Sequence, residues 1–480
     1  MSEPGGYAAR AHPTLEDPVA AALSEAVGGP LGEHSAPHRW WTPVRVVLAL
    51  TAVCFALGML QKAPCYQDTW LDSDARYTQM CYSDLPYLYV GRGFVELNWP
   101  YDDDPETRAR YEVMEYPVGI SYFAWGTAWL THWVTGSPEV EARASVPTSD
   151  LYSDKQVLRE IRTYVAVSAV LLGAAAIVAA WFLARTHRDR PWDAALFALS
   201  PALLLTGLVN WDMLAVLLVA AALWAWSRDR PVLTGVLIGL GTATKLYPLF
   251  LLGGVLVICL RRRDWLTPLK VAVSALGAWM LANAPAYLTG RDEWKVFWSF
   301  NSDRGADLGS VWLVAQQAGH AVSHETINTT SWLFFGAWCV AVFVIGMLAP
   351  DPPRLAQLGF LVVAGFLFVN KVYSPQYVLW LLPLAVLARP RWRDLLIWQA
   401  GEIFYFAMVW WYLGGFLQPG AGDRPGFYWL AIVVRIACEL WLVVVVARDV
   451  LRPLHDPVDR EPDEPDDGQL MSMRSNAVAV

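Results

Sequence analysis

Long apolar runs separated by short polar connectors dominate this sequence. The clearest runs are 164–184 (YVAVSAVLLGAAAIVAAWFLA) and 331–349 (SWLFFGAWCVAVFVIGMLA). A helix rises about 1.5 Å per residue, so about twenty apolar residues span the roughly 30 Å hydrocarbon core of a bilayer. The pattern therefore predicts an all-α, polytopic membrane protein with about twelve or thirteen transmembrane or re-entrant helices. The expected segments are 44–61, 116–134, 163–185, 192–209, 211–226, 231–245, 247–260, 268–288, 331–349, 355–370, 375–388, 394–416 and 426–447.

Short basic connectors orient these segments. Cytoplasmic loops carry an excess of Lys and Arg, which assigns the basic connectors to the cytoplasm. They lie at 185–190, 227–230, 261–264, 389–394 and 448–453. Two large hydrophilic loops, 62–115 and 289–330, then face the extracytoplasmic side. We expect a multi-pass protein of the cell membrane with its functional site on that side.

At one place, successive segments do not alternate in direction across the membrane as consecutive crossings must. A first crossing at 44–61 puts loop 62–115 outside, yet segment 163–185 must also begin outside. Segment 116–134 is therefore re-entrant or interfacial, unless a neighbouring segment is misassigned. The stretch 231–260 is short for two crossings, and the alternative interpretation is one broken helix.

Composition supports a membrane domain at 44–447 between two polar tails. The chain is 55% hydrophobic and 17% charged. Residues 1–43 and the acidic segment 453–480 are expected to be disordered cytoplasmic tails. The net charge of −8 derives largely from these tails and from the loop around YDDDPE, and no basic stripe indicates binding to nucleic acid.

Polar residues on the extracytoplasmic side are the candidates for chemistry. Ionisable groups at membrane depth are costly and usually functional. Cations suit a phosphate, and aromatic rings suit the face of a sugar. The candidates are Asp84, Tyr87, Arg92, Glu115, Asn210, Asp212, Lys245, Asp303, Arg304, Asn370, Lys371, Tyr373 and Gln376.

Three motifs carry a family resemblance over roughly 44–447. They are YSDLPYLY followed by EYPVG, then GVLIGLGTATKLYPLFLL, and finally NKVYSPQYVLWLLPL. With them the chain resembles the actinobacterial integral-membrane mannosyltransferases of glycosyltransferase family 87 (formerly domain of unknown function 2029), of the GT-C fold class. The resemblance implies a polyprenyl-phosphate sugar donor, an outward-facing site and an essential acid in the first extracytoplasmic loop. By motif, that acid is Asp84.

The chemistry gives Asp84 a rationale of its own. Displacing a polyprenyl phosphate from an anomeric carbon requires a base that deprotonates the acceptor hydroxyl. The phosphate leaving group needs cations, for which Lys245, Lys371 and Arg304 are the candidates, and no general acid. Alternatively, Asp84 only caps a short helix that begins after it.

Two other groups of residues have structural interpretations. Cys65 and Cys81 fall in the oxidising outer loop, either as a disulfide or as two free thiols. Arg435, Glu439 and Glu402 are expected to form a packed ion pair or triad within the last two helices.

We expect a hexosyltransferase, with mannose as the hexose, that transfers its sugar with inversion to a lipid-linked or cell-envelope acceptor. Its partners are the polyprenyl-phosphate sugar, the acceptor glycan and membrane lipids. No cofactor is expected, although the carboxylates at 72–74 and 102–104 leave a divalent-cation site open. The competing hypotheses are a carrier or flippase for lipid-linked sugars and a non-catalytic envelope scaffold.

Overall fold

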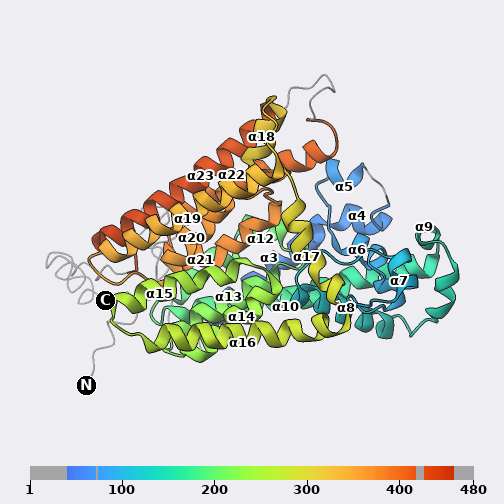
Figure 1. Ribbon diagram of the computed structural model, residues 1–480, viewed down its shortest axis with the longest axis horizontal. Coiled ribbons are helices and arrows are strands. Elements are labelled where there is room, and N and C mark those ends of the chain that lie inside the picture. Colours follow the sequence, from blue (N-terminus) through green and yellow to red (C-terminus); the bar gives the residue numbers. More distant parts are fainter. Residues whose placement is uncertain (1–39, 72–73, 418–425, 459–480) are drawn as a thin grey trace, which may run out of the picture.

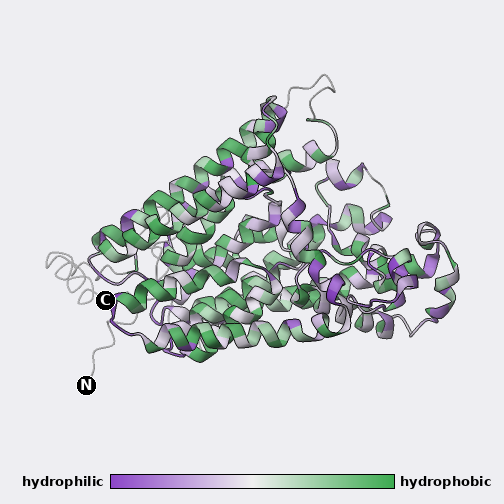
Figure 2. Ribbon diagram, viewed as in Figure 1, coloured by the Kyte–Doolittle hydropathy of each residue, from purple (hydrophilic) through white to green (hydrophobic). Residues whose placement is uncertain are grey.

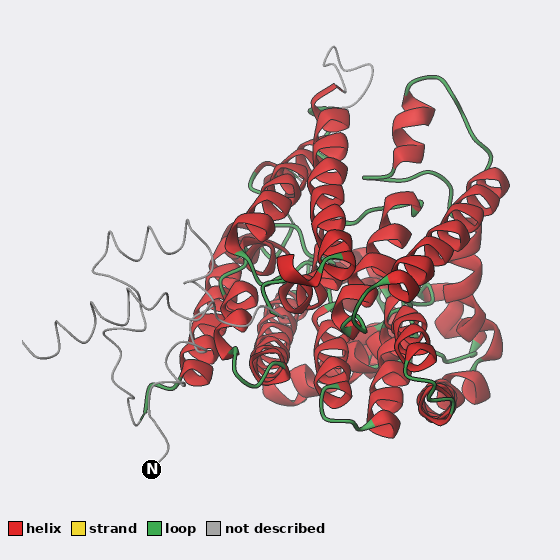
Figure 3. Ribbon diagram, turned by 90° about the vertical axis from the view of Figure 1, so that its left-hand side faces the viewer, coloured by secondary structure: helices red, strands yellow, loops and turns green. Residues whose placement is uncertain are grey.

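The computed structural model describes residues 40–71, 74–417 and 426–458, and all their regular structure is helical (Figures 1 and 3). Among these residues, five helices are long and apolar enough to cross a membrane. They are α3 (Pro43–Gln61), α10 (Lys155–Thr186), α16 (Leu266–Thr289), α19 (His324–Leu348) and α23 (Gly426–Leu451). The polytopic helical architecture expected from the apolar runs is confirmed.

Shorter apolar helices fill the centre between the long ones. They are α13 (Met213–Trp226), α14 (Pro231–Thr244), α15 (Leu251–Arg261), α20 (Leu355–Val369) and α21 (Val378–Ala388), and α22 (Trp392–Leu413) packs along α23. Segment 191–206 is broken into η4 (Pro191–Ala194), α11 (Ala195–Ala198) and α12 (Pro201–Thr206). The stretch 231–260 is interrupted at Lys245, which lies in extended backbone before η5 (Tyr247–Phe250).

The outer loops also fold into helices. Loop 62–115 contains α4 (Ala63–Asp68), α5 (Ala75–Thr78), α6 (Leu85–Gly91), η2 (Phe94–Glu96) and α7 (Pro105–Arg110). They are followed by α8 (Val118–Val134), η3 (Glu141–Ser145) and α9 (Thr148–Leu151). Helices α4 to α9 gather at one end of the long axis, where hydrophilic residues are frequent (Figures 1 and 2). Whether α8 crosses the membrane stays a prediction.

Loop 289–330 also folds into helices. It forms α17 (Arg291–Asp303) and α18 (Val311–Gln317), and η6 (Pro375–Tyr377) and η7 (Pro453–His455) complete the helical elements described. No residue of α17 is fully buried. Lys371 Nζ ties the end of this helix down by donating to the carbonyl oxygens of Asn301, at 2.6 Å, and Ser302, at 3.0 Å.

The start of the carboxyl-terminal tail corrects one expectation. Residues 1–39 and 459–480 lie outside the described residues, but 453–458 are packed against the domain instead of being disordered. Asp456 is 1% exposed and forms an ion pair with Arg354 at 2.6 Å. A buried carboxylate paired with a guanidinium fixes this short segment, which composition alone did not reveal.

Two glycines allow α14 and α16 to approach closely. A Cβ added at Gly235 would lie 2.3 Å from the carbonyl oxygen of Val271, and one added at Gly239 would lie 2.1 Å from that of Ala275. Small residues four apart on one helix face let two helix backbones meet. This contact fixes the helix that ends at Lys245.

We expect Gly239→Val to force α14 and α16 apart. Overpacking of this kind typically costs about 1–3 kcal/mol, so the thermal unfolding midpoint of the purified protein should fall by several degrees. Gly277→Val in α16 is the matched control, because an added Cβ there meets nothing within 4 Å. An equal loss of stability in both variants would show that helix propensity, and not the close contact, is responsible.

Candidate functional site

Asp84 lies at the wall of a cavity of about 390 Å³, here called the Asp84 cavity. Its backbone N–H donates to the carbonyl oxygen of Val209 at 2.7 Å, and the neighbouring Ser83 hydroxyl donates to that of Leu208 at 2.8 Å. These bonds join the start of α6 to the segment between α12 and α13. The position of the carboxylate is thus set by tertiary contacts between distant parts of the chain.

The Asp84 carboxylate accepts a hydrogen bond from the Tyr116 hydroxyl at 2.8 Å. Burial raises the pKa of Asp84 to about 6, although hydrogen bonds from Tyr116 and Tyr82 act in the opposite direction. Asp84 is the first residue before α6, yet its side chain makes no capping hydrogen bond to the helix. The purely structural interpretation, a helix cap, therefore lacks its defining contact.

Lys245 reaches the same cavity from the break between α14 and η5. Its ammonium forms an ion pair with Asp212 at 2.9 Å and lies 4.5 Å from the centre of the Tyr116 ring. The Trp380 indole N–H donates to the other oxygen of Asp212 at 2.8 Å. This network holds Lys245 beside Tyr116, and hence near Asp84.

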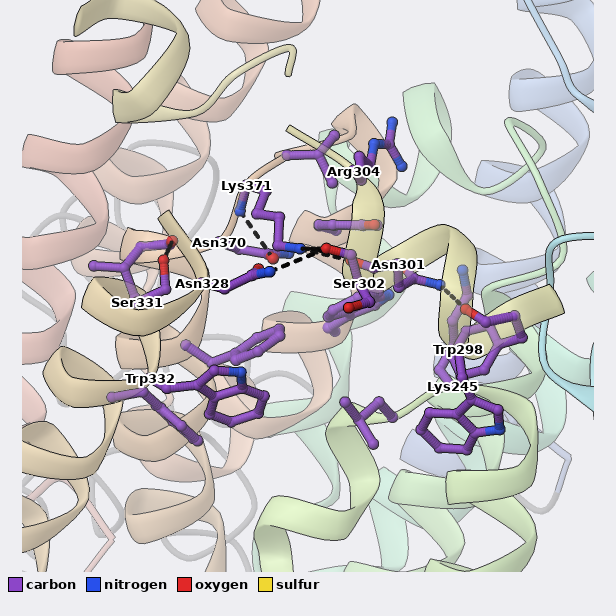
Figure 4. A pocket seen from close by; sticks show the side chains of 18 residues that line it. Lys245, Trp298, Asn301, Ser302, Arg304, Asn328, Ser331, Trp332, Asn370 and Lys371 are labelled. Carbon is purple, nitrogen blue, oxygen red and sulfur yellow. Dashed lines mark hydrogen bonds between the residues drawn. The ribbon is translucent and has the colours of Figure 1, made fainter. Parts of the chain in front are cut away.

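A second cavity of about 370 Å³ adjoins the first and is here called the Trp332 cavity. Figure 4 shows it from close by, with Trp332 on one side and Trp298 on the other. Its wall is mainly apolar and aromatic, and includes Phe335 and Phe366. The two cavities share Lys245, Phe297, Asn301, Arg304 and Tyr377, so both cations stand where one cavity meets the other.

Three cations lie around this junction, and two of them are paired with carboxylates. Arg304 is paired with Asp307 at 2.8 Å, and Lys245 is paired with Asp212. Lys371 lines the Trp332 cavity and donates to two backbone carbonyls. Burial and the positive charge of Arg304 lower the pKa of Lys371. An anion at the junction would meet three cations together with the carboxylates that pair with two of them.

The structure brings most of the predicted site residues together. Asp84, Tyr87, Glu115 and Gln376 line the Asp84 cavity, Asn370 and Lys371 line the Trp332 cavity, and Lys245 and Arg304 line both.

Four predicted contacts need correction, because these residues do not line either of the two cavities. Asn210 and Asp212 are 1% and 0% exposed, and they support Tyr116 and Lys245. Tyr373 is 0% exposed and donates to Glu402 at 3.0 Å. Arg92 forms ion pairs with Glu115 and Glu112. These residues were predicted because they are polar, but polarity in the sequence does not show whether a side chain lines the cavity or packs elsewhere.

The predicted packing of charges in the last helices is also seen. Arg435 forms an ion pair with Glu439 at 3.0 Å, and its guanidinium carbon lies 3.6 Å from the centre of the Tyr373 ring. Since Tyr373 in turn binds Glu402, the three charged residues support the loop that carries Gln376.

Sequence reasoning missed several cavity residues. Tyr116 was overlooked although it lies in the EYPVG motif, and Tyr82 although it lies in YSDLPYLY. Phe297, Tyr377 and Trp410 carried no signal beyond aromatic composition. Membrane-helix ends are generally rich in such rings, so composition could not select these ones.

The structure answers one of the two open questions about loop 62–115, and the other stays a prediction. Cys65 and Cys81 are joined in a disulfide, one of the two alternatives, and Cys81 lies three residues before Asp84. The second question is whether a divalent cation binds here. Within the described ranges, no group of three His, Cys, Asp or Glu side chains is arranged to hold a metal ion. Asp72 lies outside those ranges.

The fold and this site define a class, a polytopic membrane protein with a cavity that holds a buried carboxylate and shares part of its wall with a more apolar cavity. Residues 156–370 match the model of glycosyltransferase family 87. No curated protein sequence matches the chain significantly. The family match and the apolar helices together indicate a membrane glycosyltransferase. The matched range contains Lys245, Arg304 and Asn370, whereas Asp84 precedes it.

Proposed function

We propose that this protein transfers a hexose, mannose, from a polyprenyl-phosphate donor to a lipid-linked or cell-envelope acceptor on the extracytoplasmic face of the cell membrane. The observation that carries the proposal is the junction of the two cavities. Lys245 and Arg304 stand at the junction, the Asp84 carboxylate lies on its polar side, and an apolar cavity lies on the other.

The two cavities match the two halves of such a donor. A sugar joined to an isoprenoid through a phosphodiester needs a polar space for the sugar, cationic side chains beside the phosphate and an apolar path for the isoprenoid, in that order. An apolar groove of about 290 Å³ between α15, α19 and α20 shares Phe335 with the Trp332 cavity and extends the apolar path. The phosphate would lie at Lys245 and Arg304, with the hexose toward Asp84.

The reaction is a single displacement with inversion. The acceptor hydroxyl gives its proton to Asp84, and its oxygen forms a bond to the anomeric carbon. The bond from that carbon to the phosphate oxygen breaks, and its electron pair leaves on the polyprenyl phosphate. Lys245 and Arg304 stabilise the departing charge, and Lys371 adds to the positive potential there.

The test is transfer by the purified wild-type protein. Radiolabelled polyprenyl-phosphate mannose is incubated with a membrane lipid extract, and labelled product is separated from donor. We expect a labelled product that requires both substrates. Donor binding without any product from mannosyl, glucosyl or arabinosyl donors would favour the carrier hypothesis, which a flipping assay in liposomes would then examine.

The pKa of Asp84 predicts the acid limb of the pH profile. Because only the deprotonated carboxylate can accept the proton, kcat/KM should fall about tenfold per pH unit below about pH 6. An Asp with its ordinary pKa near 3.8 would keep full activity two units lower. A profile that stays flat to pH 4.5 in a protein that remains folded would contradict the role of Asp84 as base.

A further inference from the structure

Lys62, the residue directly after α3, is a buried cation. It is 1% exposed and lines neither the Asp84 cavity nor the Trp332 cavity. Its ammonium donates a hydrogen bond to the carbonyl oxygen of Tyr82 at 2.9 Å. Removing an ammonium from water is costly unless hydrogen bonds and an opposite charge compensate for it. The burial of Lys62 therefore indicates a specific role for its charge.

The segment that leads into α6 is not helical, and side chains from outside it hold its carbonyl groups. The Gln61 side-chain N–H donates to the carbonyl oxygen of Met80 at 2.7 Å. The Trp70 indole N–H donates to that of Cys81 at 3.2 Å. Lys62 supplies the next contact along the chain. Three successive carbonyl groups are thus fixed just before the proposed base.

Tyr82 connects Lys62 to the base in two ways. It lies two residues before Asp84 in the chain, so the position of its peptide group sets the path of the backbone into Asp84. Its hydroxyl also donates a hydrogen bond to the Asp84 carboxylate, and both residues line the Asp84 cavity. A shift of the Tyr82 peptide would therefore move the carboxylate and one of its hydrogen-bond donors together.

Lys62 and Asp84 also act on each other through their charges. Burial lowers the pKa of Lys62 to about 7, and the Asp84 carboxylate opposes this effect. Lys62 is therefore charged near pH 6, where Asp84 loses its proton, and an opposite charge favours the deprotonated carboxylate. Burial raises the pKa of Asp84, and four other groups act on it, all of which lower it except Glu115: Tyr82, Tyr116, Glu115 and Lys245.

We propose that Lys62 is a positioning residue for the Asp84 base, which its ammonium holds in place through the Tyr82 peptide and keeps deprotonated through its charge. Because Lys62 lines neither cavity, it acts on the reaction through Asp84 and not by touching a substrate. The inference rests on the proposed function and adds a residue from outside the cavity to the machinery of proton transfer.

The first test is the pH profile of Lys62→Met, in which a side chain of similar length lacks the ammonium. We expect kcat on the pH plateau to fall at least tenfold, because a slightly misplaced base is inefficient. The KM for polyprenyl-phosphate mannose should change less than twofold. The acid limb of kcat/KM should move to higher pH by about half a unit or more. Lys62→Arg, which keeps the charge, should leave the limb at its wild-type pH.

Gln61→Met is the matched control, because it removes the neighbouring contact to Met80 without changing a charge. Its acid limb should stay where it is in wild type. The thermal unfolding midpoint is measured for each variant. If Lys62→Met does not fold, Lys62→Gln provides the same comparison, since it keeps an N–H donor and lacks the charge.

A double variant shows whether Lys62 acts through the base. In the Asp84→Asn background, Lys62→Met should not lower the residual rate of transfer further, because the effects of coupled residues are not additive. A purely structural role would lower the rate equally in both backgrounds, and that result overturns the proposal. So does an acid limb that stays in place without the Lys62 charge, or one that moves in Lys62→Arg.

Failure of the underlying function gives different results. Full activity of Asp84→Asn would contradict the assignment of the base, and with it the role of Lys62. Absence of any transfer by the wild-type protein would contradict the proposed function itself. An inactive Asp84→Asn together with a Lys62→Met that matches wild type in kcat and pH profile overturns only the inference about Lys62.

Discussion

Asp84→Asn should lower kcat/KM for sugar transfer by about 10²–10⁴, the range that a positioned general base contributes. Asparagine keeps the size of the side chain and an oxygen that can accept from Tyr116, so the fold and the binding of donor should persist. The measurement is labelled product per unit time, together with donor affinity and the thermal unfolding midpoint of each variant.

The control for this substitution is Glu112→Gln, which changes a carboxylate that is 83% exposed in the same outer loop. It should retain nearly full activity. If Asp84→Asn keeps more than a tenth of wild-type kcat/KM, another group removes the proton. If it loses donor binding as well, Asp84 acts in positioning the sugar and not as the base.

Lys245→Gln should produce the second large loss, about 10²-fold or more in kcat/KM, because the cation nearest the leaving phosphate disappears. It should also destabilise the protein. Asp212 is fully buried and would lose its ion-pair partner, and breaking a buried pair typically costs about 3–5 kcal/mol. Activity and stability would then fall together and could be confused.

The double variant Lys245→Gln/Asp212→Asn separates the two effects. Without the buried negative charge, the thermal unfolding midpoint should return most of the way to that of wild type. Activity should stay low, because no cation has been restored at the junction. Recovery of activity together with stability would show that Lys245 serves only to neutralise Asp212.

The all-helical membrane architecture could be predicted because it depends on local chemistry. Backbone groups in hydrocarbon must bond within their own segment, so long apolar runs such as 164–184 can only be helices. The break at Lys245 could also be predicted, because a lysine before Tyr-Pro interrupts an apolar run. Polar residues at helix ends likewise marked Asp84, Arg304 and Gln376 as members of a site.

The partners of those residues could not be predicted. Asp84 meets Tyr116 and Val209, and Lys245 meets Asp212 and Trp380, across separations that no motif spans. Helix periodicity says which residues share a face of one helix, but not which helix ends adjoin. The same limit explains why Tyr373 and Asn210 were expected in the cavity and do not line it.

The sequence by itself thus determined the helices, their polar ends and the Asp84 motif, because each follows from the solvation of short stretches of chain. Only the tertiary structure decided that Lys245 and Arg304 stand where the Asp84 cavity meets the more apolar Trp332 cavity, and that Tyr77, Tyr82, Tyr87 and Trp410 lie on one cavity wall. Those relations arise from the packing of helices far apart in the sequence, where close contacts such as that of Gly239 with Ala275 set the geometry.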